Sequence, residues 1–408
     1  MTAAPARGRD PRLDVFRGLA MCIILLAHMR WTVLADYIPA RFGLSDAAEM
    51  FVFLSGCASA IAFGGTFRRS GFLVGTARIA HRCWQLYLSH LMLFFVVAVL
   101  AAGASAAFAS PDYFDVAYIT WFFTDPASAL IRLFSLSYVP AYLDIMPVYI
   151  VVLALVPAMM ALARIHVLLG PAASVALYLA ANATGWNFLA DPTDGRGWFL
   201  NPFAWQLVFF AGFSLSSGWI APPPPDRRLL QAAVGVLLVG LVVKLPGLAE
   251  WLSPIAALSS LILDHSDKTL LDPMRFVHFL SAAYVVHCLF EGRTRVLEHP
   301  LLRPLRKIGQ QALPSFLFSI VLSNAGGIAF DQLGADWTMQ VLINAAALGL
   351  LVGGAYVVAW FKSTPWKRPA AALPAETSPS RQPAFPTAAR WPTLAVGGTS
   401  VVQPEARP

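Results

Sequence analysis

Apolar residues fill long stretches of this chain, and short polar segments separate one stretch from the next. Three of the clearest stretches, residues 148–163, 229–243 and 341–360, contain no charged residue. A helix needs about 20 mostly apolar residues to cross the core of a bilayer, whereas strands of a membrane barrel alternate polar and apolar positions over about 10 residues. The pattern therefore predicts an all-α protein, a polytopic integral membrane bundle of helices.

The number of apolar stretches predicts about ten transmembrane helices. We expect them at residues 14–34, 48–66, 84–108, 143–163, 167–186, 201–220, 229–246, 273–290, 308–330 and 338–361. Two long connections interrupt the series. Residues 110–142 are apolar enough for a short interfacial helix around 118–123, and residues 247–273 contain a segment, 255–263, that suits a re-entrant or surface helix.

Charge is scarce and unevenly distributed along the chain. Charged residues make up 12% of it and hydrophobic residues 58%, whereas about 25% of a typical soluble domain is charged. Lys and Arg gather in alternate loops, and the positive-inside tendency then places both termini in the cytoplasm. The net charge of +7 follows from these loops. We therefore expect a lipid bilayer, and no nucleic acid, as a partner.

Composition also divides the chain into three parts. Residues 1–13 form a cytoplasmic N-terminal segment, residues 14–361 the transmembrane domain, and residues 362–408 a cytoplasmic tail rich in Pro and Ala that we expect to be disordered. The four cysteines lie in or beside apolar stretches, so we expect them to pack rather than to form a disulfide framework. No metal site is predicted.

Ionisable residues inside a membrane helix are costly, and they are therefore the first candidates for function. The first span carries Asp14, Arg17 and His28. Arg17 and His28 are almost three helical turns apart, so they share one face of the helix at a separation of about 16 Å along its axis. Two alternatives stay open: Arg17 anchors the helix at the interface, and His28 is a hydrogen-bonded packing residue.

Asp46 and Glu49 fall in the first turn of the second span. Acidic residues suit this place because they cap the helix and face the positive end of its dipole. The functional alternative is that one of the two carboxylates reaches His28. There it would orient the imidazole and stabilise the imidazolium that forms when the ring takes a proton.

Two further basic groups stand near the ends of later spans. Arg78 and Arg82 precede the third span, where they either follow the positive-inside tendency or bind the phosphates of a nucleotide-bearing donor. Lys268, Arg275 and His278 enter the eighth span from the side that otherwise has little positive charge. They either anchor that helix at the interface or bind an anionic acyl group or an acceptor sugar.

Several of these segments together resemble one known family. The resemblance is carried by residues 12–20 with His28 and residues 42–56, and it is supported by residues 144–150, 201–206 and 267–278. From Arg12 to about Trp366 the chain resembles the OpgC family, bacterial inner-membrane proteins that succinylate osmoregulated periplasmic glucans. That family is similar to the broader membrane acyltransferase family three, whose first span has an arginine and a histidine separated by ten residues, as Arg17 and His28 are here.

The resemblance implies a membrane O-acyltransferase that moves an acyl group, in this family succinyl, from acyl-CoA to hydroxyls of an extracytoplasmic glucan. Acyl-CoA, and succinyl-CoA in particular, is then a co-substrate, and no bound cofactor is expected. The candidate residues are His28, Asp46 and Glu49 for catalysis, with His28 as the base, Arg17, Arg78 and Arg82 for the donor, and Lys268, Arg275 and His278 for the acceptor or the acyl carboxylate.

Two other functions fit the same residues. Arginine and histidine inside the membrane also suit a substrate pathway, so a transporter or flippase of a glycan or an acyl donor stays open. The other is an acyltransferase that uses acetyl groups and a different polysaccharide or lipid acceptor.

Overall fold

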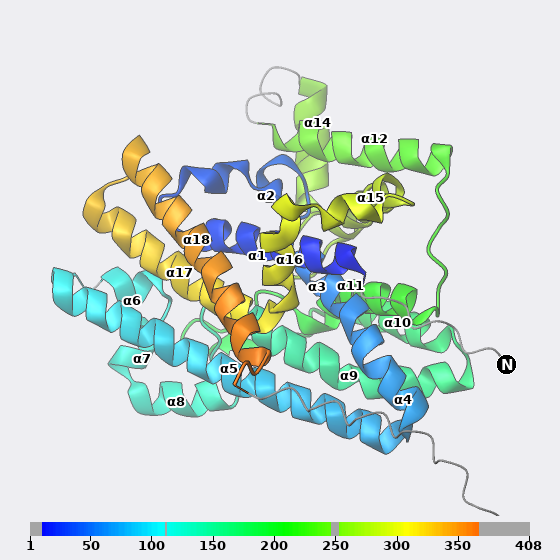
Figure 1. Cartoon of the computed structure of the whole chain (residues 1–408), viewed down its shortest axis with the longest axis horizontal. Coiled ribbons are helices and arrows are strands. Elements are labelled where there is room, and N and C mark those ends of the chain that lie inside the picture. Colours follow the sequence, from blue (N-terminus) through cyan, green and yellow to red (C-terminus); the bar gives the residue numbers. More distant parts are fainter. Residues whose placement is uncertain (1–9, 111, 246–252, 367–408) are drawn as a thin grey trace, which may run out of the picture. The chain divides into compact units, whose positions relative to one another are not determined.

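The computed structural model describes residues 10–110, 112–245 and 253–366, and in these ranges the chain is almost entirely helical (Figure 1). The predicted all-α class is confirmed; within the described ranges, β1 (Leu189–Asp191) and β2 (Arg196–Gly197) form the one small hairpin. The chain divides after Ser363 into two units. The expected N-terminal segment up to residue 9 and the expected disordered tail from residue 367 onward lie outside the described residues.

Helices occupy all ten segments that were expected to cross the membrane. They are α1 (Pro11–His28), α3 (Ala47–Ser59) continued by the π-helical turn η2 (Ala60–Gly64) and α4 (Gly65–Arg69), α5 (Gly71–Phe108), α9 (Ile145–Ile165), α10 (Leu169–Thr184), α11 (Pro202–Ser217), α12 (Arg227–Lys244), α15 (Pro273–Phe290), α17 (Ala312–Leu333) and α18 (Trp337–Lys362).

Six of the described helices are long and apolar enough to cross a bilayer, namely the continuous helix of α3, η2 and α4, then α5, α9, α15, α17 and α18. The predicted number of about ten is therefore not confirmed. α10 and α11 have 16 residues each, fewer than a full span needs. α1 and α12 each contain three Lys, Arg or Asp residues, which lower their mean hydropathy.

Short helices fill the connections between these elements. They are η1 (Val33–Tyr37), α2 (Pro39–Phe42), α6 (Asp112–Val116), α7 (Thr120–Thr124), α8 (Pro126–Phe134), α14 (Ser253–Asp264), η3 (Thr294–Glu298), η4 (Pro300–Leu302) and α16 (Arg303–Gln310). The helices expected around residues 118–123 and 255–263 are present as α7 and α14.

α5 is longer than the third span that the sequence predicts. It begins at Gly71 and not at residue 84, and it runs for 38 residues. At 1.5 Å per residue this is about 57 Å, whereas the hydrocarbon core of a bilayer is about 30 Å thick. Arg78 and Arg82 therefore lie on the helix itself. The hydropathy pattern did not predict residues 71–83 as part of this span, because their charged side chains lower the local hydropathy. Arginine and alanine nevertheless favour a helix, so the helix continues through them.

Glycine lets α11 approach α3 very closely. α11 is buried along most of its length, including Trp205 and Phe209. A Cβ atom at Gly56 of α3 would lie 2.0 Å from the carbonyl oxygen of Phe209, and one at Gly212 of α11 would lie 2.2 Å from that of Phe53. Such contacts between small residues are a common way for membrane helices to pack.

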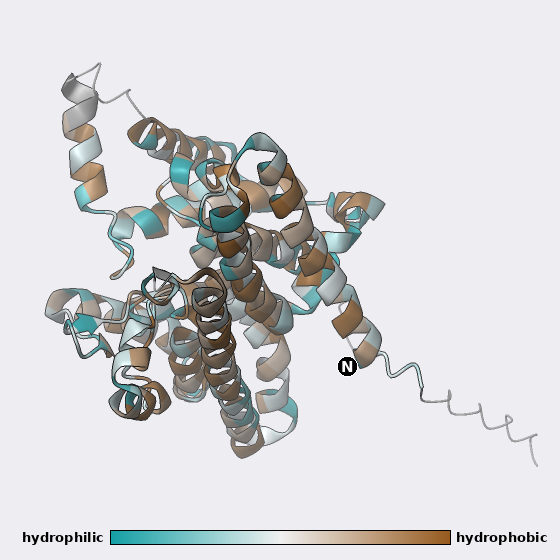
Figure 2. Ribbon diagram, turned by 90° about the vertical axis from the view of Figure 1, so that its left-hand side faces the viewer, coloured by the Kyte–Doolittle hydropathy of each residue, from teal (hydrophilic) through white to brown (hydrophobic). Residues whose placement is uncertain are grey.

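The outward faces of the long helices are apolar. In Figure 2 these helices are mostly hydrophobic, and hydrophilic residues gather in the connecting segments and near helix ends. On α18, the side chains of Val341, Leu350 and Val357 are each more than half exposed. Soluble proteins rarely expose contiguous apolar faces of this kind, so these faces contact lipid and the chain is a multi-pass membrane protein.

Candidate active site

Two acidic residues begin α3 and cap its first turn together. The side chain of Asp46 accepts a hydrogen bond from the Ala48 amide at 2.7 Å, and the Glu49 carboxylate accepts one from the Asp46 amide at 2.9 Å. This reciprocal capping box satisfies amides that a helix leaves unpaired at its start. The capping role that the sequence allowed for these residues is present, and it fixes both carboxylates in place.

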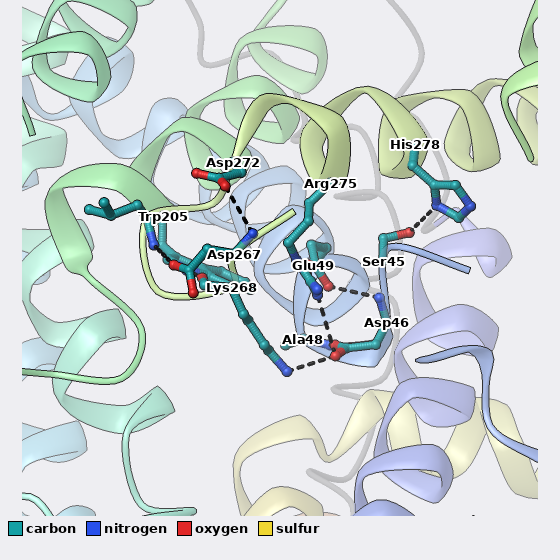
Figure 3. Close-up of polar contacts among 11 residues, drawn as sticks. Ser45, Asp46, Ala48, Glu49, Trp205, Asp267, Lys268, Asp272, Arg275 and His278 are labelled. Carbon is teal, nitrogen blue, oxygen red and sulfur yellow. Dashed lines mark hydrogen bonds and ion pairs between the residues drawn. The ribbon is translucent and has the colours of Figure 1, made fainter. Parts of the chain in front are cut away.

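Lys268 and Arg275 point toward these carboxylates from the segment that leads into α15 and from its first turn (Figure 3). Lys268 Nζ donates to Asp46 Oδ2 at 2.6 Å, and Arg275 Nε and Nη2 donate to Glu49 Oε1 at 2.9 and 2.6 Å. Burial opposes ionisation of Asp46, but Lys268 and Arg275 outweigh it and hold the pKa of this carboxyl below its ordinary value. Two carboxyl groups therefore face two cations at this site.

The segment that carries Lys268 is held by side chains from two other helices. Trp205 Nε1 of α11 donates to the Lys268 carbonyl at 2.8 Å, and the Tyr178 hydroxyl of α10 donates to the Leu271 carbonyl at 3.0 Å. Leu271 also has a left-handed backbone, with φ of 51°. The position of Lys268 thus depends on the packing of α10, α11 and α15.

His28 ends α1 and packs against an aromatic residue from a distant loop. Its ring centroid lies 4.6 Å from that of Tyr142. Its Nδ1 atom is buried and has no hydrogen-bond partner among the described residues. The expected direct contact with Asp46 or Glu49 is absent in the described part of the chain, because both carboxylates are held by the two cations.

A cavity of about 970 Å³ brings three of the predicted site residues together, since His28, Asp46 and Lys268 all line it. Glu49 and Arg275 are not among its described walls, although both contact Asp46. In the described ranges, no group of three His, Cys, Asp or Glu side chains suits a metal ion. The other polar and aromatic walls include Asp115, Tyr118, Trp121, Tyr138, Tyr142, Asp144, Asp191, Asp194, Arg196 and Phe199.

Three notable residues of this cavity, Asp144, Tyr118 and Tyr142, were not among the predicted site residues. Asp144 is 5% exposed, and its Oδ1 atom has no hydrogen-bond partner among the described residues. Tyr118 and Tyr142 have left-handed backbones, with φ of 55° and 68°. This conformation costs about 1–3 kcal/mol per residue and tends to occur at functional sites. An acidic residue just before an apolar stretch was the available signal for Asp144, whereas nothing in the sequence marked the two tyrosines.

His278 is outside the described lining of this cavity and instead ties α15 to the segment before α3. Its Nδ1 atom shares a hydrogen bond with Ser45 Oγ at 2.8 Å (Figure 3). Two glycines leave room for the ring: a Cβ at Gly43 would lie 2.7 Å from its Cε1 atom, and one at Gly240 would lie 2.6 Å from its Cδ2 atom. This tight packing fits a structural role better than contact with an acyl group or a sugar.

Arg17 and Arg82 line a second cavity, of about 250 Å³. Arg17 is buried, and its Nη2 atom donates to the Leu54 carbonyl of α3 at 2.8 Å. Ile145 and Phe316 belong to the walls of both this cavity and the larger one. The two cavities are therefore neighbours, with these two apolar side chains between them.

Arg78 has a different environment from the other two arginines. Its Nη1 atom donates to the Ala62 carbonyl at 2.9 Å and to the Thr66 hydroxyl. It thereby ties α5 to η2 and α4. The described lining of the second cavity does not include it, so the expected group of three arginines is only partly assembled.

A comparison with models of known protein families identifies the family of this chain. A model described as OpgC protein matches residues 9–363, which include all the described helices and the walls of both cavities. No curated protein and no solved structure matches the chain. The resemblance noted in the sequence is thus confirmed, and the chain belongs to the OpgC protein family.

Proposed function

We propose that this protein is a membrane O-acyltransferase that transfers a succinyl group from succinyl-CoA to a hydroxyl of an extracytoplasmic glucan. Membership of the OpgC family supports acyltransferase activity on periplasmic glucans. The apolar helices support a multi-pass membrane protein. We assign it to the bacterial inner membrane, with both termini in the cytoplasm. The donor then approaches from the cytoplasm and the acceptor from the opposite side.

The observation that carries this proposal is the imidazole of His28, which lines the larger cavity together with Asp46 and Lys268. A general base must lie within reach of the proton that it removes. His28 takes the proton of the acceptor hydroxyl while the hydroxyl oxygen attacks the thioester carbonyl. The carbon–sulfur bond then breaks, and the proton passes from His28 to the sulfur, which yields an ester and free CoA.

Lys268 supports succinyl as the transferred group. A succinyl group has a free carboxylate, which needs a cation that an acetyl group does not. The Lys268 ammonium has three N–H groups, and one of them is used by Asp46. Its side chain is 28% exposed and lines the larger cavity, so the remaining N–H groups suit the donor's carboxylate. Arg275 is assigned instead to holding Glu49.

Arg17 and Arg82 support a site for the CoA phosphates in the second cavity. A guanidinium group presents a rigid fork of donors that matches phosphate geometry. Their cavity adjoins the larger one at Ile145 and Phe316, which suits a donor whose phosphates and thioester lie in different cavities. Arg78 is assigned to packing, because its Nη1 atom donates to η2 and α4.

Mass spectrometry of periplasmic glucans tests this function. In a bacterial host that lacks its own glucan succinyltransferase, the wild-type chain restores succinyl groups and His28→Ala does not, at equal protein levels in the membrane. As a matched control, His166→Ala changes an exposed histidine after α9 and leaves succinylation unchanged. Succinylated glucans with the His28 variant would remove His28 from the chemistry.

The same experiment separates the other two functions. A transporter would restore glucans to the periplasm of a deletion strain without changing them covalently. An acetyl-dependent acyltransferase would add acetyl groups in place of succinyl groups.

A further inference from the structure

Asp144 is a buried acid near Arg196 that forms no ion pair with it in the described part of the chain. It precedes α9 at the N-cap position, yet its side chain makes no capping hydrogen bond. Among the described residues, it is the one carboxylate with a buried oxygen that lacks a partner. A buried acceptor without a donor costs roughly 1–3 kcal/mol, and more when it is charged. Because Asp144 lines the same cavity as His28, a ligand is the natural source of the missing donor.

The other acids of the cavity differ from Asp144 because each has a partner: Lys268 donates to Asp46 and the Thr120 hydroxyl to Asp115, and the hairpin uses the remaining two. Asp191 Oδ1 accepts from the amide and the hydroxyl of Thr193, and Asp194 Oδ1 accepts from the Arg196 amide at 2.8 Å. These bonds shape the turn of the hairpin between β1 and β2. The unmet acceptor is therefore at Asp144 and not at the hairpin.

Two tyrosines line the cavity together with Asp144 and His28. The ring of Tyr142 contacts those of His28 and Tyr118, with centroid distances of 4.6 and 5.7 Å. Both tyrosines are about half exposed and line the cavity. The face of an aromatic ring is electronegative, so it attracts the C–H groups of a sugar ring. An unmet carboxylate in the same cavity as such faces suits a ligand that has hydroxyl groups and an apolar face, which is the chemistry of a neutral sugar.

We propose that the acceptor glucan places one sugar ring between Asp144 and the pair Tyr118–Tyr142, with a ring hydroxyl donating to Asp144 Oδ1. This inference rests on the proposed function, because it assigns the acceptor part of the same cavity. Asp144 exchanges no proton in the transfer. It orients the ring so that a neighbouring hydroxyl faces His28, which removes the proton.

Calorimetry without any acyl donor tests the acceptor site by itself. The full chain in lipid nanodiscs is titrated with unsubstituted glucan purified from the periplasm of the deletion host. Asp144→Ala weakens binding by roughly 10- to 100-fold, the range expected for losing a hydrogen bond to a charged group. Asp144→Asn recovers part of this loss, because its amide oxygen still accepts a hydrogen bond. Unchanged affinity in Asp144→Ala overturns the inference.

A control variant accompanies this titration. Glu298→Ala changes an exposed acid of η3 outside the described cavity walls and leaves binding unchanged. Loss of binding in the Glu298 variant would show that the effect of Asp144→Ala is one of charge alone and would overturn the inference.

A second variant covers the case in which Asp144→Ala fails to fold. Tyr118→Gly removes the ring but suits the left-handed backbone at this position, so the protein stays folded. We expect glucan binding to fall at least fivefold, and binding equal to the wild type would overturn the inference.

Failure of this inference is distinguishable from failure of the proposed function. A wild-type protein that binds glucan but transfers no acyl group refutes the transferase function and keeps the glucan site. A wild-type protein that succinylates glucan, with an Asp144→Ala variant whose KM for glucan is unchanged, refutes the assignment of Asp144.

Discussion

At the scale of single residues, burial decides what each charge of the site does. The Glu49 side chain is fully buried and that of Arg275 is 11% exposed, so this pair has little contact with water. Breaking such a pair leaves an uncompensated ion in a medium of low polarity. Lys268 is more exposed, at 28%, and it faces the cavity. Arg275 and Glu49 therefore hold the geometry, and Lys268 is available to a ligand.

We expect Glu49→Gln to destabilise the fold strongly. The amide keeps the shape of the side chain but leaves Arg275 without its main counter-ion, at a cost of roughly 3–5 kcal/mol. Asp36→Asn is the control, because Asp36 and Arg41 form an ion pair with both side chains more than half exposed, and such pairs contribute about 0–1 kcal/mol. Thermal unfolding in detergent compares the two variants, and equal unfolding midpoints would contradict the structural role of Glu49.

Lys268→Gln is expected to change donor preference. The variant loses the cation that we propose for the free carboxylate of succinyl but retains Arg275 near Asp46, at 3.5 Å, so it folds. The ratio of kcat/KM for succinyl-CoA to that for acetyl-CoA falls by roughly 10-fold or more, since a hydrogen bond to a charged group contributes about 1.5–3 kcal/mol. Lys362→Gln, at the end of α18, is the control. An unchanged ratio in Lys268→Gln means that another group reads the succinyl carboxylate.

At the scale of helices, close packing at two glycines positions the helices that carry the site residues. Gly56 and Gly212 bring α3 and α11 into backbone contact, and α11 in turn holds the carbonyl of Lys268 through Trp205. α3 carries Asp46 and Glu49 at its start. The contact between these two helices therefore sets the distance over which the carboxylates and the cations meet.

Gly56→Ala is expected to force α3 and α11 apart. The added Cβ would meet the Phe209 carbonyl at 2.0 Å, a backbone atom that cannot move without shifting α11, and overpacking of this kind costs roughly 1–3 kcal/mol or more. Gly103→Ala in α5 is the matched control, because a Cβ there meets nothing within 4 Å and alanine favours the helix by about 1 kcal/mol. Unfolding midpoints and succinylation should both fall for Gly56→Ala alone.

At the scale of the whole membrane unit, the two cavities belong to different ends of α1. His28 at the end of this helix faces the larger cavity, whereas Arg17, about 16 Å away along the axis, faces the smaller one. The segments that wall the larger cavity follow α1 and α5 and precede α3, α9, α11 and α15. With the ten spans that the sequence predicts, these ends share one side of the membrane, and we propose that the acceptor enters there and the donor from the other side.

Cysteine labelling tests this arrangement. We expect a membrane-impermeant maleimide to label Asp194→Cys in the hairpin from outside intact spheroplasts and to label Glu298→Cys only after permeabilisation. Both positions are exposed, and the parent chain with its four native cysteines supplies the background. The reverse pattern would invert the topology and place the acceptor cavity on the cytoplasmic side.

The sequence by itself determined the membrane class, the ten helical segments and the positions of most charges that form the site. These properties depend on each segment alone, because a stretch of apolar residues must become a helix wherever lipid surrounds it. The errors of the sequence-based prediction were local as well. It placed the start of α5 too late, because charged residues obscure the continuing helix. It also predicted more full spans than the structure supports, because some of the helices are short or charged.

Only the tertiary structure decided which of these charges act together. Arg275 binds Glu49 across 226 residues of chain, and Lys268 binds Asp46. Neither carboxylate is therefore available to His28, which packs against Tyr142. Asp144 stood out only when its oxygen proved to be buried without a partner in the described part of the chain. Pairing, desolvation and backbone strain depend on distances between segments, and a linear pattern of hydropathy and charge contains no such distances.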